Sequence, residues 1–163
     1  LWSRGHRRFG IVTMSRSDIC QAQRTAGFLE TLRELGGAPE QVMIREYRSL
    51  NDSVSGVISA LANMQERPTA LFSTNSLMSQ KLIAGAAAVG IRVPEELSLL
   101  SFEENNELLY MPVPVSAIRQ PTRELGETAV RMLINLIRGL AVPEHEVLNC
   151  SLVARSSVAK RNE

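Results

Sequence analysis

The chain has 163 residues, of which 44% are hydrophobic and 21% charged, enough for one ordinary domain, or one lobe of a larger one, with a real core. Eighteen Lys and Arg residues against seventeen Asp and Glu residues give a formal charge of +1, so the strongly basic surface of a DNA-binding module is missing. Aromatic residues make up only 4%, which argues against a stacking platform for single-stranded nucleic acid.

The sequence shows no sign of a membrane or secreted protein. No apolar run approaches the roughly 18–20 residues that a membrane span needs, so we expect no membrane partner. The two cysteines, Cys20 and Cys150, cannot form a disulfide framework, and free thiols suit a cytoplasmic protein. Residues 1–8 do not resemble a secretory signal. The first residue is not Met, and we therefore expect that the chain can be part of a longer protein.

Short apolar runs alternate with helical patterns, which is typical of an α/β fold with a parallel sheet. The first predicted strand, 8–14, is followed by cap-type residues and a helix over 19–35 that ends at a Gly-Gly pair. A second strand over 41–47 leads into a helix that contains 54–61.

The second half continues this alternation. A strand at 70–73 opens a small-residue helix over 76–89, and further strands follow at 97–100 and 115–118. A longer, amphipathic helix with an apolar stripe is then predicted over 121–140. We predict a final strand over 146–153. Together these patterns predict a three-layer α/β lobe built on a parallel sheet.

Polar residues that follow the predicted strands form the candidate site, because ligands of a parallel sheet collect beyond the carboxyl ends of its strands. In chain order they are Ser15, Arg16, Asp18, Cys20 and Arg24, then Arg48 and Asn51, then Asn75, then Glu103 and Glu104, and finally Arg119 and Gln120. Their guanidinium, amide and carboxylate groups can bind a hydroxyl-rich ligand. Taken singly, each is more simply explained as a solvated or capping residue, and Arg24 can instead pair with Glu103 to hold an empty cleft together.

Catalytic and metal sites find little support. The sequence has neither a G-x-S-x-G motif nor a phosphate-binding loop. His6 and His145 precede strands, and we expect both at the surface. The cysteines and histidines lack metal-ligand spacing. A magnesium pocket of Asp18, Glu103 and Glu104 is disfavoured because a nearby arginine would compete for the carboxylates. We expect no enzyme activity, no cofactor and no metal.

Seven segments, in order and at matching spacings, carry a family likeness. They are GHRRFGIV (5–12), RTAGF (24–28), PTALFSTNSLM (68–78), GIRVPEELS (90–98), SFEE (101–104), IRQP with LG (118–121 and 125–126), and LVARSS (152–157). This series resembles the lactose/galactose repressor family of bacterial transcription regulators over nearly the whole chain.

The resemblance implies an effector domain shaped like a periplasmic sugar-binding protein of type I, in which two α/β lobes clamp a small molecule. The whole chain, 1–163, then corresponds to part of this domain: a second lobe over about 6–117, a crossover helix over 121–140 and a returning strand over 146–153. The family's DNA-binding headpiece is absent from this chain. Self-association is one way to cover the apolar stripe of the long helix.

The resemblance also suggests site residues. Its effector contacts fall on Arg24, Asn75 and Glu103, and the secondary candidates are Asp18, Cys20, Asn51 and Gln120. Glu103 stands where the family usually has Asp, which adds one methylene and reshapes the cleft. The expected ligand is a small hydroxylated molecule, namely a sugar, a sugar acid, a polyol or a nucleoside, and stacking on a ring is not expected to hold it.

The family's dimer contacts suggest a homodimer surface on the small-residue helix and on the segment near residue 109. Its expected members are Met78, Ser79, Leu82, Ile83, Leu109 and Tyr110. The predicted function is the effector-sensing and dimerisation region of a transcriptional repressor, which reaches operator DNA through a headpiece outside this chain. The alternatives are a periplasmic sugar-binding component of a transporter and an enzyme on a doubly wound sheet.

Overall fold

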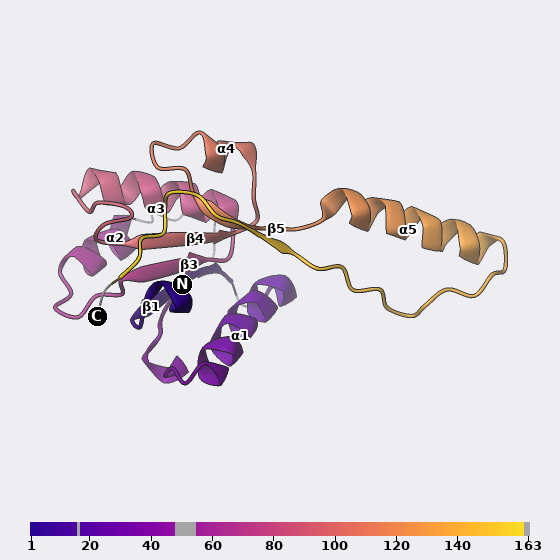
Figure 1. Ribbon diagram of the computed structural model, residues 1–163, viewed down its shortest axis with the longest axis horizontal. Coiled ribbons are helices and arrows are strands. Elements are labelled where there is room, and N and C mark those ends of the chain that lie inside the picture. Colours follow the sequence, from indigo (N-terminus) through magenta and orange to yellow (C-terminus); the bar gives the residue numbers. More distant parts are fainter. Residues whose placement is uncertain (16, 48–54, 162–163) are drawn as a thin grey trace.

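The computed structural model describes residues 1–15, 17–47 and 55–161. Six strands form one sheet in the order β2-β1-β3-β4-β5-β6 (Figure 1). The strands are β1 (Phe9–Met14), β2 (Met43–Tyr47), β3 (Ala70–Ser73), β4 (Ser98–Phe102), β5 (Ser116–Arg119) and β6 (Ser151–Val153). The first five run parallel to their neighbours, and β6 pairs antiparallel with β5. The predicted α/β fold class is confirmed.

Helices lie on both faces of the sheet and so make the three predicted layers. They are η1 (Trp2–Arg4), α1 (Ile19–Glu34), η2 (Pro39–Gln41), α2 (Ser55–Ala62), α3 (Ser76–Ala88), α4 (Asn106–Leu109) and α5 (Thr122–Ile137). Figure 1 shows α1 on one side of the strands and α2 and α3 on the other. None of the helices in the described ranges is long and apolar enough to cross a membrane.

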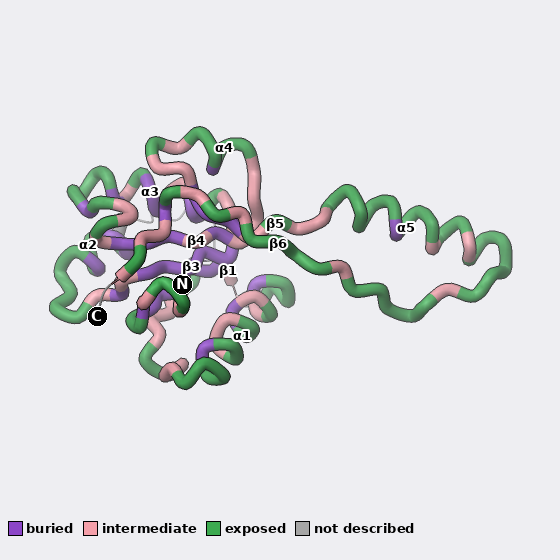
Figure 2. The backbone as a smooth tube through the Cα atoms, in the orientation of Figure 1, coloured by how far each residue is buried: buried purple, intermediate pink, exposed green. Residues whose placement is uncertain are grey.

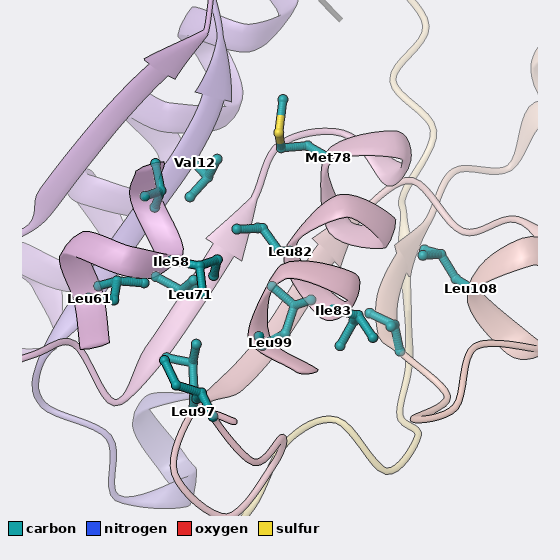
Figure 3. Packing of buried hydrophobic residues seen from close by; sticks show 14 of the residues in the cluster. Val12, Ile58, Leu61, Leu71, Met78, Leu82, Ile83, Leu97, Leu99 and Leu108 are labelled. Atoms are coloured by element: carbon teal, nitrogen blue, oxygen red, sulfur yellow. The ribbon is translucent and has the colours of Figure 1, made fainter. Parts of the chain in front are cut away.

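The core divides between the two faces because successive strand residues point to opposite sides. On the face under α2 and α3, Val12, Leu71 and Leu99 pack against helix residues in one buried cluster; its members shown in Figure 3 include Ile58, Leu61, Met78, Leu82, Ile83 and Leu108. The opposite face holds a smaller aromatic cluster around Phe9, against which Phe28 of α1 packs. One face of α3 is therefore buried in this cluster, whereas Leu77, Ala84 and Ala87 on the same helix are exposed.

The chain leaves the sheet after β5 and returns at β6, and we call the segment between them, residues 120–150, the arm. Figure 1 shows α5 and the returning segment projecting away from the sheet. The arm is mostly exposed (Figure 2), and its uncovered apolar side chains include Leu125, Leu133, Leu136 and Leu140, which lie at helical spacing. Within the described chain, this stripe has no core to pack against.

The last strand is shorter than predicted. The expected strand over 146–153 is limited to β6, because only Ser151–Val153 has a partner in β5 and the preceding residues run along the arm instead. The long helix also ends early, at Ile137, since Gly139 adopts a left-handed φ of 71° that terminates it.

His6 is buried, which corrects the prediction of a surface histidine. The side chain has no exposed area, and its two ring nitrogens bind the Oγ1 of Thr69 at 2.9 Å and the carbonyl of Ala159 at 3.2 Å. A carbonyl can only accept, so Nε2 donates to Ala159, and in the neutral ring Nδ1 is then an acceptor for the hydroxyl of Thr69. Burial lowers the pKa of His6. The ring joins the N-terminal segment, the start of β3 and the C-terminal segment.

Candidate functional site

The candidate site lies where the carboxyl ends of β1, β3 and β4 meet. Three of the expected residues, Arg24, Asn75 and Glu103, belong to the elements that follow these strands, and parallel pairing of β1 with β3 and of β3 with β4 brings them to one edge of the sheet. A small ligand at this edge can therefore contact several chain segments at once.

Arg24 is the residue around which the site is built. It lies in the second turn of α1, and its Nη1 donates to the carbonyl of Thr74 at 2.8 Å and to Oε1 of Glu103 at 3.1 Å. The guanidinium lies over the ring of Phe102, 4.2 Å from the ring centre. Only 14% of the Arg24 side chain is exposed. These contacts hold a cationic, planar donor in one orientation at the strand ends.

Glu103 faces Arg24 from the end of β4. Its backbone has a φ of 75°, a left-handed conformation that is rare outside glycine. The backbone N–H donates to the carbonyl of Ile118 at 3.1 Å, and the hydroxyl of Ser101 donates to the Glu103 carbonyl at 3.2 Å. Oε2 lies 3.4 Å from the hydroxyl of Ser76. Several bonds thus maintain an uncommon conformation that turns the carboxylate toward Arg24.

Asn75 and Asp18 both cap helices. Oδ1 of Asn75 accepts from the backbone of Leu77 and Met78 at the start of α3, at 2.9 and 3.3 Å. Asp18 does the same for α1, with Cys20 and Gln21 as donors at 2.8 and 3.3 Å. The capping explanation weighed in the sequence analysis therefore holds for these two oxygens. Because the cap uses the side-chain oxygen of Asn75, only the amino group of this side chain can still bind a ligand.

Cys20, Arg24 and Gln120 line a groove of about 820 Å³ between α1 and the sheet. Most other lining residues are apolar, among them Phe28, Phe72, Leu100, Phe102 and Ile118. The polar site at the strand ends therefore opens onto an apolar groove, and Arg24 takes part in both. Asn51 lies outside the described residues, as do Arg16 and Arg48.

The sequence did not lead us to predict a network of buried hydrogen bonds behind the site. The hydroxyl of Thr74 contacts both the hydroxyl of Thr13 and the side-chain carbonyl of Gln21, and all three residues are buried. This network of hydrogen bonds holds Thr74 in place at the end of β3, and the carbonyl of Thr74 accepts from Arg24. The sequence feature that could have indicated this network is the presence of Thr13 and Thr74 at the ends of two predicted strands, where apolar residues are more usual.

The acidic residues do not form a joint pocket. Glu103 faces Arg24, Asp18 caps α1, and Glu104 pairs with Arg119 and Arg155. The hydrogen bond from Arg119 is the main cause that lowers the pKa of Glu104, with Arg155 adding to it against partial burial. Each carboxylate thus has its own partner.

Four of the six residues expected at a dimer surface are internal. Met78, Ser79, Leu82 and Ile83 have at most 4% of their surface exposed, because this side of α3 packs on the sheet, on α2 and on α4. That part of the expectation is corrected: these side chains cannot contact a second copy in this arrangement. Leu109 and Tyr110 are exposed.

Comparison with known proteins places this geometry in a family. A model of the periplasmic binding protein-like domain matches residues 1–158. The HTH-type transcriptional repressor PurR of Aliivibrio salmonicida is 30% identical over 162 residues, which cover 96% of this chain and 47% of that protein. The chain thus spans about half the length of the curated relatives it matches.

Solved structures agree with this assignment. A LacI-family transcriptional regulator from Bifidobacterium animalis superimposes with a TM-score of 0.89 at 26% identity, covering 99% of this chain and 59% of that one. A lac repressor dimer bound to operator and the anti-inducer ONPF gives a TM-score of 0.87 at 25% identity, covering 98% of this chain and 55% of that one. The chain belongs to the periplasmic binding protein-like domain family and has the effector-domain fold of LacI/GalR-type transcription regulators.

Proposed function

We propose that this chain is the effector-sensing part of a transcriptional repressor and that it binds a small hydroxylated molecule at the Arg24–Glu103 site. The observation that carries the proposal is the fixed, partly exposed pairing of a guanidinium with a carboxylate at the strand ends. Binding is reversible and involves no covalent step, so the chain acts as a sensor and not as an enzyme.

The chemistry of the site suits a ligand with hydroxyl groups. A hydroxyl can accept from Arg24 while it donates to Glu103, and the amino group of Asn75 adds a second donor. Gln120 and Cys20 border the same approach through the groove. A sugar, a sugar acid, a polyol or a nucleoside offers such hydroxyls, and the apolar groove beside Arg24 accommodates the less polar face of such a ligand.

The relatives support a regulatory role over transport. The curated relatives are named as HTH-type transcriptional repressors, and the lac repressor was solved as a dimer with operator and an anti-inducer. By analogy, the whole protein acts in the cytoplasm, forms a homodimer and reaches operator DNA through a headpiece. The sheet and its helices then form one lobe, about 6–117, and the arm crosses to a second lobe. A periplasmic transport component is not favoured.

A thermal-shift screen tests the proposal. The chain is heated with neutral sugars, sugar acids, polyols and nucleosides, and a specific ligand raises the melting temperature by mass action. Arg24→Ala should strongly reduce the shift, whereas Arg33→Ala, which removes an exposed guanidinium from the same helix, should keep it. Equal shifts in both variants would place the ligand elsewhere.

A further inference from the structure

Two consecutive carboxylates, Glu103 and Glu104, face different parts of the molecule. Glu103 contacts Arg24 of the site, whereas Glu104 contacts Arg119 at 3.1 Å and also Arg155. The left-handed φ of Glu103 lies at this junction. A single peptide bond therefore connects the effector site to a second ionic cluster.

The partners of Glu104 stand at the base of the arm. Arg119 is the last residue of β5, and three residues later α5 begins, while Arg155 follows β6, the strand on which the arm returns. Next to them, β5 and β6 pair through only three residues each. So short a pairing of β5 with β6 does little to fix the orientation of the arm. Glu104 contacts both Arg119, where the arm begins, and Arg155, beyond the strand on which the arm returns.

The cluster is built into the structure. Only 10% of the Arg155 side chain and 18% of that of Glu104 are exposed. Arg155 also donates from Nη1 to the carbonyl of Val115 at 2.8 Å, and its backbone N–H donates to the hydroxyl of Ser116 at 2.9 Å. An ion pair with this degree of burial and several additional hydrogen bonds has a defined geometry, unlike a flexible surface pair.

We propose that Glu104 is a positioning residue that fixes the direction in which the arm leaves the sheet, and that the Glu103–Glu104 peptide couples the effector site to this direction. The second half rests on the proposed function. When a ligand takes up the hydrogen bonds between Glu103 and Arg24, the shift of Glu103 acts on Glu104 and, through the bond of its own N–H to Ile118, on β5. The site thus controls the base of the arm directly.

The two cysteines of the chain provide the measurement. Cys20 lies at the start of α1 beside the site, Cys150 precedes β6 on the arm, and both are exposed and free. With nitroxide labels on both residues, pulsed electron paramagnetic resonance measures the distribution of distances between the site and the arm, and no effector is needed. The result therefore does not depend on whether the ligand screen succeeds.

Glu104→Gln should replace a single narrow distance distribution by a broad one, while Glu107→Gln, an exposed carboxylate on α4, should leave it unchanged. Arg119→Gln, at a side chain that is 54% exposed, should broaden it less and keeps the test valid if Glu104→Gln folds poorly. A purely structural role would lower the melting temperature without changing the distribution of the folded molecules. An unchanged distribution in Glu104→Gln and Arg119→Gln would overturn the positioning role.

The coupling has its own test in the same assay. Glu103→Gln weakens the bond to Arg24 and leaves Glu104 intact, so it should shift the maximum of the distribution while keeping it narrow. Arg24→Ala should shift it in the same direction. If both variants superimpose on the wild type, the coupling is wrong, even where the positioning role of Glu104 holds.

Discussion

Arg24 of α1 and Glu103 after β4 form an ion pair across the strand ends, with 3.1 Å between Nη1 and Oε1. The pair explains why both residues are held so firmly, and it means that either substitution affects folding as well as binding. Arg24→Ala should lower the free energy of unfolding by about 2 kcal/mol, since the carbonyl of Thr74 and the carboxylate lose a charged donor. Urea titration of the ligand-free chain measures this loss. A stability equal to that of the wild type would show that the pair contributes nothing.

Asn75 permits capping to be separated from ligand binding. Asn75→Ala removes the cap of α3 and should cost about 1 kcal/mol, whereas Asn75→Ser keeps a capping oxygen and should retain most of the stability. Serine lacks the amide amino group, so Asn75→Ser should still bind the ligand more weakly than the wild type. Chemical denaturation and calorimetric titration of both variants give the two quantities. Full ligand affinity in Asn75→Ser would limit Asn75 to a capping role.

His6 should make stability fall in mildly acidic solution. Burial lowers its pKa in the folded chain below the ordinary value of 6.5, so below that pH the unfolded chain binds more protons than the folded one. The free energy of unfolding should therefore decrease as the pH falls from 7 to about 5. Urea titrations at several pH values in this interval measure the slope.

A variant without the imidazole identifies the source of this slope. His6→Gln can still donate to the carbonyl of Ala159, and its stability should change less over the same interval. Glu104 and Glu96 have lowered pKa values, for Glu96 about 2, so their contribution to stability is lost only at lower pH. Parallel curves for the two proteins would mean that another group is responsible.

The exposed stripe of α5 should drive self-association of this chain. Leu133 and Leu136 are each more than half exposed and lie on one side of the helix. Light scattering at tens of micromolar should show dimers, and Leu133→Glu with Leu136→Glu should give monomers. Gly56→Glu is a matched control, because a side chain at this exposed position of α2 meets nothing within 4 Å. A wild-type chain that stays monomeric would contradict the prediction.

The sequence allowed the five parallel strands, most boundaries of the longer helices and the convergence of Arg24 with Glu103 to be predicted, because each depends on local patterns and on the geometry of parallel sheets. The burial of His6 was not predictable in this way, since its partners Thr69 and Ala159 are distant in the sequence. The internal position of Met78 follows from packing against α2 and the sheet. The different partners of Glu103 and Glu104 depend on one left-handed residue, for which the sequence contains no glycine signal.

The role of Arg24 in effector binding is tested most directly by calorimetric titration of a ligand found in the screen against three proteins: the wild type, Arg24→Ala and Arg33→Ala. We expect the affinity of Arg24→Ala to fall by about 10- to 100-fold, as the loss of a charged hydrogen bond implies, and that of Arg33→Ala to remain unchanged. An affinity of Arg24→Ala equal to that of the wild type, in a variant that is still folded, would contradict an effector site at Arg24 and Glu103.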